Sequence, residues 1–318
     1  MTPRIEYLGA IAAHAGIALG SEPLEAPREG FVTVNGLRLR YLDWGAPDAP
    51  PLLLLHGGGQ SAHTWDAFSL AVRNRFRCIA LDQRGHGDSQ WSEAGDYATS
   101  EHARDIAAFV DALALDPPIV VGMSMGGVNG IAYAAAHPLR LRGFVCVDVG
   151  PETQLEAVDR LMRGLVNYRT FASPENAAAR MSALGARRDP ELLRETLALN
   201  LRIQEDGSWT WKYDPRTLIG LTAREIMDAR RPLWGILHRI TCRVLVVRGE
   251  NSEIFTDADA QRLADALPRG EWTRVPNARH SIQTDNPVGL ATVVCNFVDA
   301  LSAENANEES RCVSRTIP

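Results

Sequence analysis

Strand-like and helix-like hydrophobic patterns alternate along the chain. Residues 30–45 alternate apolar and polar positions around Asn35-Gly36, which predicts a β-hairpin. Continuous apolar runs, which are typical of strands buried on both faces, follow at 51–57, 77–82, 118–124, 144–151 and 243–249. A further strand pattern follows at 271–276. Helix-like segments separate them, at 62–73, 99–114, 125–138, 257–267 and 287–301. This order predicts an α/β fold with a mostly parallel sheet and helices on both faces.

The strand–helix rhythm breaks between residues 152 and 240, which contain helix-like segments and no comparable buried strand. We therefore expect a helical cap, inserted into a core made of 30–151 and 241–302. Residues 1–29 are expected to form an N-terminal extension, as an additional helix or a leader. The polar tail, 303–318, is predicted to be disordered.

Composition narrows the possible partners and the compartment. A chain of 318 residues with 45% hydrophobic content can bury a full core, and its net charge of −6 argues against a nucleic-acid partner. The chain contains no run of 18 uncharged apolar residues, so we expect no membrane span. Five scattered cysteines indicate reduced thiols and a cytoplasmic location. The expected partner is a small-molecule substrate, bound by a monomer or homodimer.

The first chemical signal is the segment Gly122-Met123-Ser124-Met125-Gly126, which fits G-x-S-x-G. A buried strand precedes it and a small-residue helix follows, as expected of a sharp strand-to-helix turn. Side chains at the flanking glycines would clash in such a turn. The turn would present the Ser124 hydroxyl at the carboxyl end of the sheet, so Ser124 is the candidate nucleophile.

A second glycine turn, His56-Gly57-Gly58-Gly59, follows an earlier buried strand. Glycines allow backbone N–H groups to approach an oxyanion closely. We expect the amide of Gly58, together with that of Met125, to form an oxyanion hole.

The candidate general base is His280, just after the last predicted strand. A serine hydroxyl is a poor nucleophile until a base takes its proton, and imidazole suits that task near neutral pH. His280 lies at the carboxyl end of its strand, the edge at which Ser124 also lies. The histidines of the glycine turns, His56 and His86, are interpreted as structural.

These motifs together resemble the α/β-hydrolase superfamily, in the branch with a helical cap. The shared features are the HGGG turn, G-x-S-M-G-G at the nucleophile, and D-x-R-G-H-G-x-S, present here as residues 82–89. The resemblance covers roughly residues 30–302. It implies an eight-stranded, mostly parallel sheet with the cap between strands six and seven.

The resemblance leaves two candidates for the acid that orients His280. In most of the family this acid follows strand seven, three residues after a glycine, a position that Ser252 occupies here when counted from Gly249. Glu253 comes one residue later and is one candidate. The other is Asp148, at the end of strand six, where some family members carry the acid. We favour Asp148, because its strand should neighbour the nucleophile strand at about 5 Å.

These residues predict a serine hydrolase that cleaves a small, largely apolar carboxylic ester through an acyl-enzyme on Ser124. The mechanism requires no metal and no organic cofactor. An amide, a lactone or a carbon–carbon bond beside a ketone would use the same triad, and the fold does not separate these substrates. A protein of a different class, a small-molecule receptor without turnover, also occurs within the superfamily.

Overall fold

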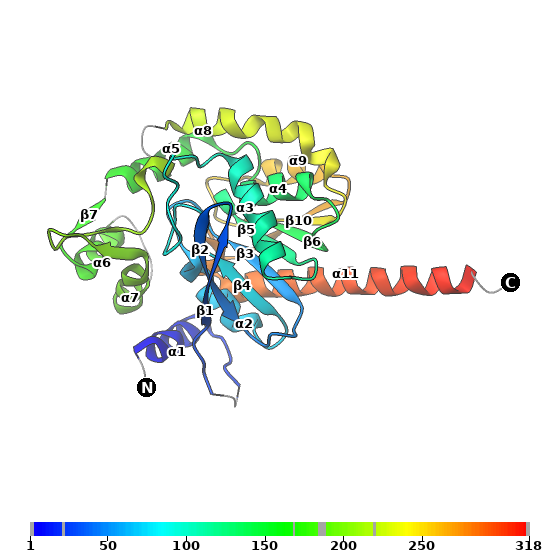
Figure 1. The fold of residues 1–318 in the computed structure, drawn as a ribbon, viewed down its shortest axis with the longest axis horizontal. Helices are drawn as coiled ribbons and strands as arrows, with labels where there is room; N and C mark the ends of the chain where they lie inside the picture. Colours follow the sequence, from blue (N-terminus) through cyan, green and yellow to red (C-terminus); the bar gives the residue numbers. More distant parts are fainter. Residues whose placement is uncertain (1–2, 21–22, 168, 184–188, 219–220, 316–318) are drawn as a thin grey trace.

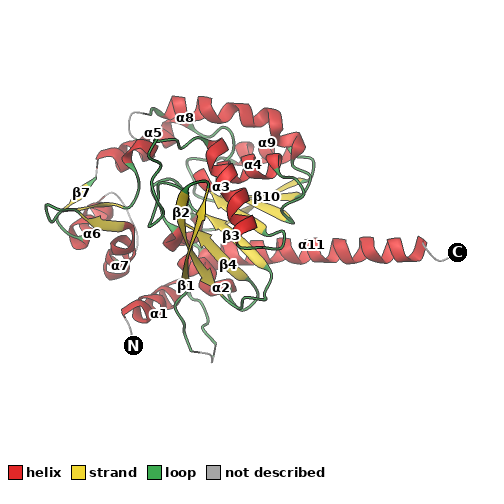
Figure 2. Cartoon of the chain, viewed as in Figure 1, coloured by secondary structure: helices red, strands yellow, loops and turns green. Residues whose placement is uncertain are grey.

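The structure is a computed structural model that describes residues 3–20, 23–167, 169–183, 189–218 and 221–315. Figures 1 and 2 show a central twisted sheet with helices on both faces. Its strand order is β1-β2-β4-β3-β5-β6-β10-β11. The strands are β1 Arg28–Val34, β2 Leu37–Trp44, β3 Pro51–Leu55, β4 Arg77–Leu81, β5 Ile119–Met123, β6 Gly143–Val147, β10 Arg243–Gly249 and β11 Gly270–Val275.

The prediction of an eight-stranded, mostly parallel sheet is confirmed. Strands β1 and β2 form the antiparallel hairpin around Asn35-Gly36, and β2 is antiparallel to β4. All the other neighbouring pairs are parallel. The carboxyl ends of β3, β5, β6 and β10 therefore meet at one edge, where ligands bind in open α/β sheets.

Helices cover both faces of the sheet because successive strand residues point to opposite sides. Leu53 and Leu55 of β3 belong to one core cluster, whereas Leu52 and Leu54 belong to the other. The first cluster is covered by α3 Thr99–Ala112, α4 Met125–Ala136, α9 Asp257–Ala266 and the 3-10 helix η3 Arg231–Arg239. The second is covered by α1 Pro3–Ala15, η1 Ala62–Trp65, α2 Asp66–Val72, α10 Ile282–Asp285 and α11 Pro287–Arg315.

The N-terminal residues that the structure describes form helix α1, which packs on the body of the protein. Tyr7, Leu8 and Ile11 are buried in the core cluster that α2 and α11 also cover. The hydroxyl of Tyr7 lies 3.3 Å from that of Thr196, in helix α7 (Pro190–Asn200) of the inserted segment between β6 and β10. Helix α1 therefore bridges the core and the inserted segment.

The segment between β6 and β10 is not purely helical, which corrects the prediction of a helical cap. It contains α5 Leu155–Asn167, α6 Pro174–Ala183, α7 Pro190–Asn200, η2 Pro215–Thr217 and α8 Ala223–Arg230, followed by η3. It also contains a small antiparallel sheet of β7 Thr170–Phe171, β8 Leu201–Ile203 and β9 Trp209–Trp211. Strands of two or three residues are too short to give a hydrophobic pattern. The Asp206-Gly207 turn between β8 and β9 is the one sequence signal for this hairpin.

The prediction of disorder at 303–318 was wrong as far as the structure describes the chain. Helix α11 continues to Arg315 and leads away from the body (Figure 1). Extending an existing helix needs no new nucleus, so a polar sequence rich in Ala and Glu can continue it. Residues 316–318 lie outside the described residues. Within the described ranges, no helix is long and apolar enough to cross a membrane.

Candidate active site

The site is built around a sharp turn between β5 and α4. Ser124 connects the two elements and has φ 50° and ψ −117°, a strained conformation for a residue with a side chain. Its N–H donates to the carbonyl of Val147 at 3.1 Å, and its own carbonyl accepts from Val128 at 3.0 Å. The turn is therefore fixed on both sides, and Ser124 stands at the N-terminus of α4.

The two flanking glycines are required by close backbone contacts. A Cβ on Gly122 would lie 2.4 Å from the carbonyl oxygen of Gly126. A Cβ on Gly126 would lie 2.3 Å from the carbonyl oxygen of Leu55, at the end of β3. Both distances are far shorter than a carbon–oxygen contact allows, so only glycine permits α4 to start this close to the sheet.

The structure brings His280 to Ser124 across 156 residues of sequence. The Nε2 atom of His280 lies 3.1 Å from the Oγ atom of Ser124, within hydrogen-bonding distance. His280 follows β11 and precedes α10, so its ring reaches over the carboxyl edge of the sheet. Its partial exposure leaves the ring accessible from the cavity described below.

Asp148 is the acid that contacts His280. Its Oδ2 atom lies 2.8 Å from Nδ1 of His280, and its side chain is fully buried. The same oxygen accepts from the Ser252 hydroxyl at 2.5 Å, while Oδ1 accepts from the Gly249 amide at 2.8 Å. Like Ser124, Asp148 has a positive φ, of 54°. Three donors and a constrained backbone thus hold the carboxylate in one orientation.

Glu253, the alternative acid, lies outside this group. Its side chain is 76% exposed and pairs with Arg160 at 2.7 Å. The neighbouring Ser252 instead points inward and donates to Asp148. Sequence reasoning rejected Ser252 because a hydroxyl cannot replace the acid, and so it missed this supporting contact. The signal was its position, three residues after Gly249, where the resemblance places an acid.

Two backbone amides at the cavity that Ser124 lines have no acceptor among the described residues. The N–H groups of Gly58 and Met125 donate to no other group in the described part of the chain. Both residues line the same cavity as Ser124. Gln60 fixes the turn, because its side-chain oxygen accepts from the Gly57 amide at 3.0 Å.

His56 and His86 have structural roles next to the site. Nδ1 of His56 donates to the carbonyl of Gly57 at 2.8 Å, and Nε2 accepts from the Gln83 amide at 3.0 Å. This arrangement needs a neutral ring. Burial lowers the pKa of His56 to about 4 and that of His86 to about 3. Both rings therefore stay uncharged at neutral pH, and His56 joins the two glycine-containing turns.

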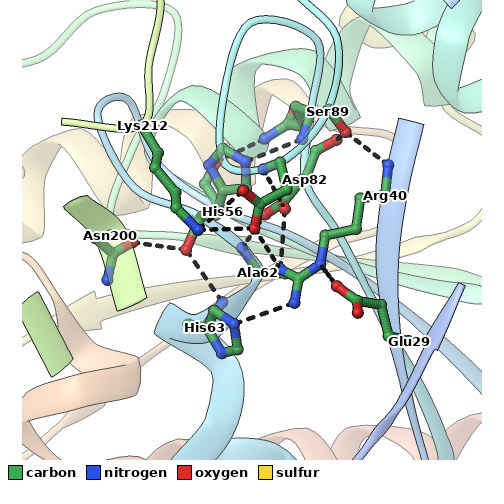
Figure 3. A network of polar contacts seen from close by, with 12 residues as sticks. Glu29, Arg40, His56, Ala62, His63, Asp82, Ser89, Asn200 and Lys212 are labelled. Carbon is green, nitrogen blue, oxygen red and sulfur yellow. Dashed lines mark hydrogen bonds and ion pairs between the residues drawn. The ribbon is translucent and has the colours of Figure 1, made fainter. Parts of the chain in front are cut away.

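A buried ionic network lies next to the two glycine-containing turns, at 56–59 and 82–89 (Figure 3). The Asp82 carboxylate accepts from Arg40 at 3.1 Å and from the Ala62 amide at 2.5 Å. Arg40 also lies 3.2 Å from the ring of His63. The network joins β2, the loop after β4 and the start of η1, and this accounts for the acidic start of the 82–89 motif.

The inserted segment is tied to the same region by two polar contacts, made by Asn200 and Lys212, which Figure 3 labels. Asn200 accepts from the Ser61 hydroxyl at 2.6 Å, and Lys212 pairs with Asp88 at 2.9 Å. These contacts hold the end of α7 and strand β9 over the glycine turns.

A cavity of about 570 Å³ opens above Ser124. This volume is in the range of small-molecule sites, about 300–1,000 Å³. Its wall is mostly apolar and comes from the core, the inserted segment and helix α1. The residues of α1 that line it are Tyr7, Ile11, His14 and Ala15, and those of α5 are Val158, Leu161 and Met162.

An eight-stranded, mostly parallel sheet with a serine at a strand-to-helix elbow and a cavity above it defines an α/β hydrolase. The sequence model of the α/β hydrolase fold family matches residues 50–287. The chain belongs to this family, as the motifs predict, and it is a hydrolase.

Three curated relatives match along most of their own length. An esterase of Mycobacterium tuberculosis is 32% identical over 81% of this chain and 85% of its own. A 3-hydroxybutyrate-oligomer hydrolase of Cupriavidus necator is 29% identical, over 84% of this chain and 96% of its own. The 2-(acetamidomethylene)succinate hydrolase of Mesorhizobium japonicum is also 29% identical, over 85% and 94%. These relatives support an ester-hydrolysing activity.

Solved structures agree with this assignment. A crystal structure of the Mycobacterium tuberculosis esterase superposes with a TM-score of 0.74 and 29% identity, over 94% of this chain and 99% of that chain. The structure of an E-2-(acetamidomethylene)succinate hydrolase gives a TM-score of 0.76 with 25% identity, over 86% and 99%.

Proposed function

We propose that the protein is a serine hydrolase that cleaves small, largely apolar carboxylic esters through an acyl-enzyme on Ser124. The observation that carries this proposal is the 3.1 Å contact between Ser124 Oγ and His280 Nε2 at the floor of the cavity. A nucleophile and a base within hydrogen-bonding distance, with the base oriented by a third group, form the geometry of nucleophilic catalysis. Asp148 supplies that third group.

The reaction proceeds in two halves. The Ser124 oxygen attacks the ester carbonyl while Nε2 of His280 takes the hydroxyl proton. The amides of Gly58 and Met125 donate to the negative oxygen of the tetrahedral intermediate, which then expels the alcohol as His280 returns the proton to it. Water attacks the acyl-enzyme by the same route, giving its proton to His280, and the acid leaves as Ser124 recovers a proton. Asp148 holds the ring in the required tautomer and stabilises the imidazolium.

The residues between β6 and β10 act as a cap in this proposal. Side chains of α5, α7 and α8 line the cavity, together with the N-terminal helix α1. The predominantly apolar wall favours an uncharged acyl or alcohol chain. The cap and α1 therefore select the substrate, while the core carries the chemistry.

The test is hydrolysis of 4-nitrophenyl butyrate by the wild type and by Ser124→Ala, with active-site labelling by a fluorophosphonate. We expect turnover and a covalent adduct on Ser124 in the wild type, and neither in the variant. Equal rates for the two proteins, with no adduct, would contradict the proposal and favour a receptor that binds without turnover. The matching 4-nitroanilide distinguishes an amide hydrolase from an ester hydrolase.

A further inference from the structure

The cavity contains two arginines, and only one of them has an anionic partner among the described residues. Arg279 pairs with Asp285 at 3.2 Å, and both residues line the cavity. Arg230 also lines the cavity but makes no hydrogen bond or ion pair with any described group. A cation in such a setting is costly unless something compensates it. Its position therefore points to a role in binding.

Helix α8 presents Arg230 to the cavity through its helical spacing. Glu225, Ile226, Ala229 and Arg230 all line the cavity, and residues four apart share one face of a helix. Ala223 and Met227, seven and three residues before Arg230, are buried in the core of the inserted segment, so this side of α8 faces inward. Helix α8 packs against α5, and the two lie side by side above the sheet in Figure 1.

The acid of α8 that also lines the cavity, Glu225, does not neutralise Arg230. The Glu225 carboxylate accepts from the backbone N–H and the hydroxyl of Thr222, at 2.7 and 2.8 Å, as part of the capping box that starts α8. Arg230 comes five positions after Glu225, a rise of roughly 8 Å along the helix axis. Glu225 is thus held at the N-terminus of α8 by the capping box, whereas Arg230 is the last residue of the helix.

Arg230 is a partly exposed residue on a cavity wall that is mostly apolar. Burial lowers the pKa of its guanidinium to about 10, which still leaves it charged at neutral pH. The cavity wall that Arg230 shares with α5 and α8 includes Leu161, Met162 and Ile226, which offer no negative charge. A guanidinium binds a carboxylate with two parallel hydrogen bonds, and the interaction strengthens where water is excluded.

We propose that Arg230 is a substrate-binding residue that recognises a carboxylate at the far end of the ester, so that the preferred substrates are monoesters of dicarboxylic acids or related ω-carboxy esters. The inference rests on the ester-hydrolase function proposed above. A monoanion fits better than a doubly charged phosphate, because Asp285 already pairs with the other arginine of the cavity. The apolar wall accommodates the methylene chain between the ester and the carboxylate.

The experiment compares esters that differ only in this charge. The probes are the mono-4-nitrophenyl esters of adipic, suberic and sebacic acid, each beside the diester whose second carboxyl is a methyl ester. We measure kcat/KM for the wild type, Arg230→Gln and Arg230→Lys. Arg224→Gln is the matched control, since Arg224 lies on the same helix, is exposed and does not line the cavity.

At the chain length that spans Ser124 and Arg230, we expect Arg230→Gln to lower kcat/KM for the monoester 10- to 100-fold. The methyl diester should change less than two-fold, and Arg224→Gln should leave both rates unchanged. Arg230→Lys should restore part of the loss, because it keeps the charge without the two-pronged geometry. An unchanged ratio of monoester to diester in Arg230→Gln, at all three lengths, would overturn the inference.

A binding measurement separates this outcome from a failure of the proposed function. Monomethyl suberate is titrated calorimetrically into Ser124→Ala and into the double variant Ser124→Ala/Arg230→Gln. Binding at least ten-fold weaker to the double variant supports the role of Arg230 even if the wild type cleaves none of the esters. Equal affinity overturns that role even if the wild type cleaves all of them.

Discussion

The hydroxyl of Ser252 donates to the same carboxylate oxygen of Asp148 that contacts His280. Ser252 occupies the position, three residues after Gly249, at which the family resemblance places an acid. The acid comes instead from the end of β6, and the residue after β10 supports it. The acid and the hydroxyl that supports it thus follow two neighbouring strands, β6 and β10, whose register pairs Val147 with Val247.

Ser252→Ala should lower kcat about 10- to 100-fold, because a hydrogen bond to a charged group contributes about 1.5–3 kcal/mol. KM should stay within two-fold, since Ser252 positions the acid and does not line the cavity. Ser252→Thr retains a hydroxyl and should restore most of the rate. Steady-state kinetics with 4-nitrophenyl butyrate provide the measurement. Loss of activity in both variants, or in neither, would contradict a positioning role.

Asp148→Asn should lower kcat by about 10³- to 10⁴-fold, because the amide favours the wrong tautomer of His280. Glu253→Gln should change kcat less than two-fold, since this exposed side chain pairs with Arg160 and not with the imidazole. The two variants are compared in the same assay, with circular dichroism as the control for folding. The reverse order of effects would assign the acid to Glu253.

Helix α1 should limit the length of the bound ester. Ile11→Trp adds bulk to the cavity wall and should lower kcat/KM for 4-nitrophenyl octanoate at least ten-fold, with little change for the acetate. Ala13→Trp is the matched control, because Ala13 is exposed on the same helix and does not line the cavity. Equal loss for octanoate and acetate would indicate damage to the fold rather than to the wall.

Glycines in the elbow and in α1 should respond oppositely to alanine. Gly126→Ala places a Cβ 2.3 Å from a carbonyl of β3 and should lower the free energy of unfolding by at least about 2 kcal/mol. Gly9 has open space around it within α1. Gly9→Ala should raise the free energy by about 0.5–1 kcal/mol through helix propensity. Urea unfolding measures both, and destabilisation by Gly9→Ala would contradict the packing of α1.

The fold should lose stability in mild acid because of His56. Its pKa falls from 6.5 in the unfolded chain to about 4 in the folded protein, so the unfolded state binds the proton first. The associated stability is present above pH 6.5 and is lost as the pH falls toward 4. Between pH 7 and pH 5 this group alone lowers the free energy of unfolding by about 2 kcal/mol, and His86 acts in the same direction.

Urea unfolding at pH 7 and pH 5 checks this prediction. A free energy of unfolding that stays constant between pH 7 and pH 5 would contradict the neutral, buried state of His56.

The core could be predicted because each central strand is a continuous apolar run, and because the elbow needs glycines on both sides of Ser124 for steric reasons. His280 followed from its place after the last strand. Asp148 and Glu253 could not be separated in this way, since the choice depends on which side chain turns inward across neighbouring strands. Arg230 and the cavity-lining residues of α1 were not found, because packing between distant segments decides which helix face meets the cavity.

Helix α1 and helix α11 leave the body at very different places (Figure 1). The first forms part of the wall around the substrate, while the second leads outward. An affinity tag or reporter fused ahead of α1 would adjoin a helix that lines the cavity, and we expect it to bias any measured preference for chain length. Fusion or surface immobilisation through the end of α11 is remote from that helix, and it is the arrangement to choose for screening substrates.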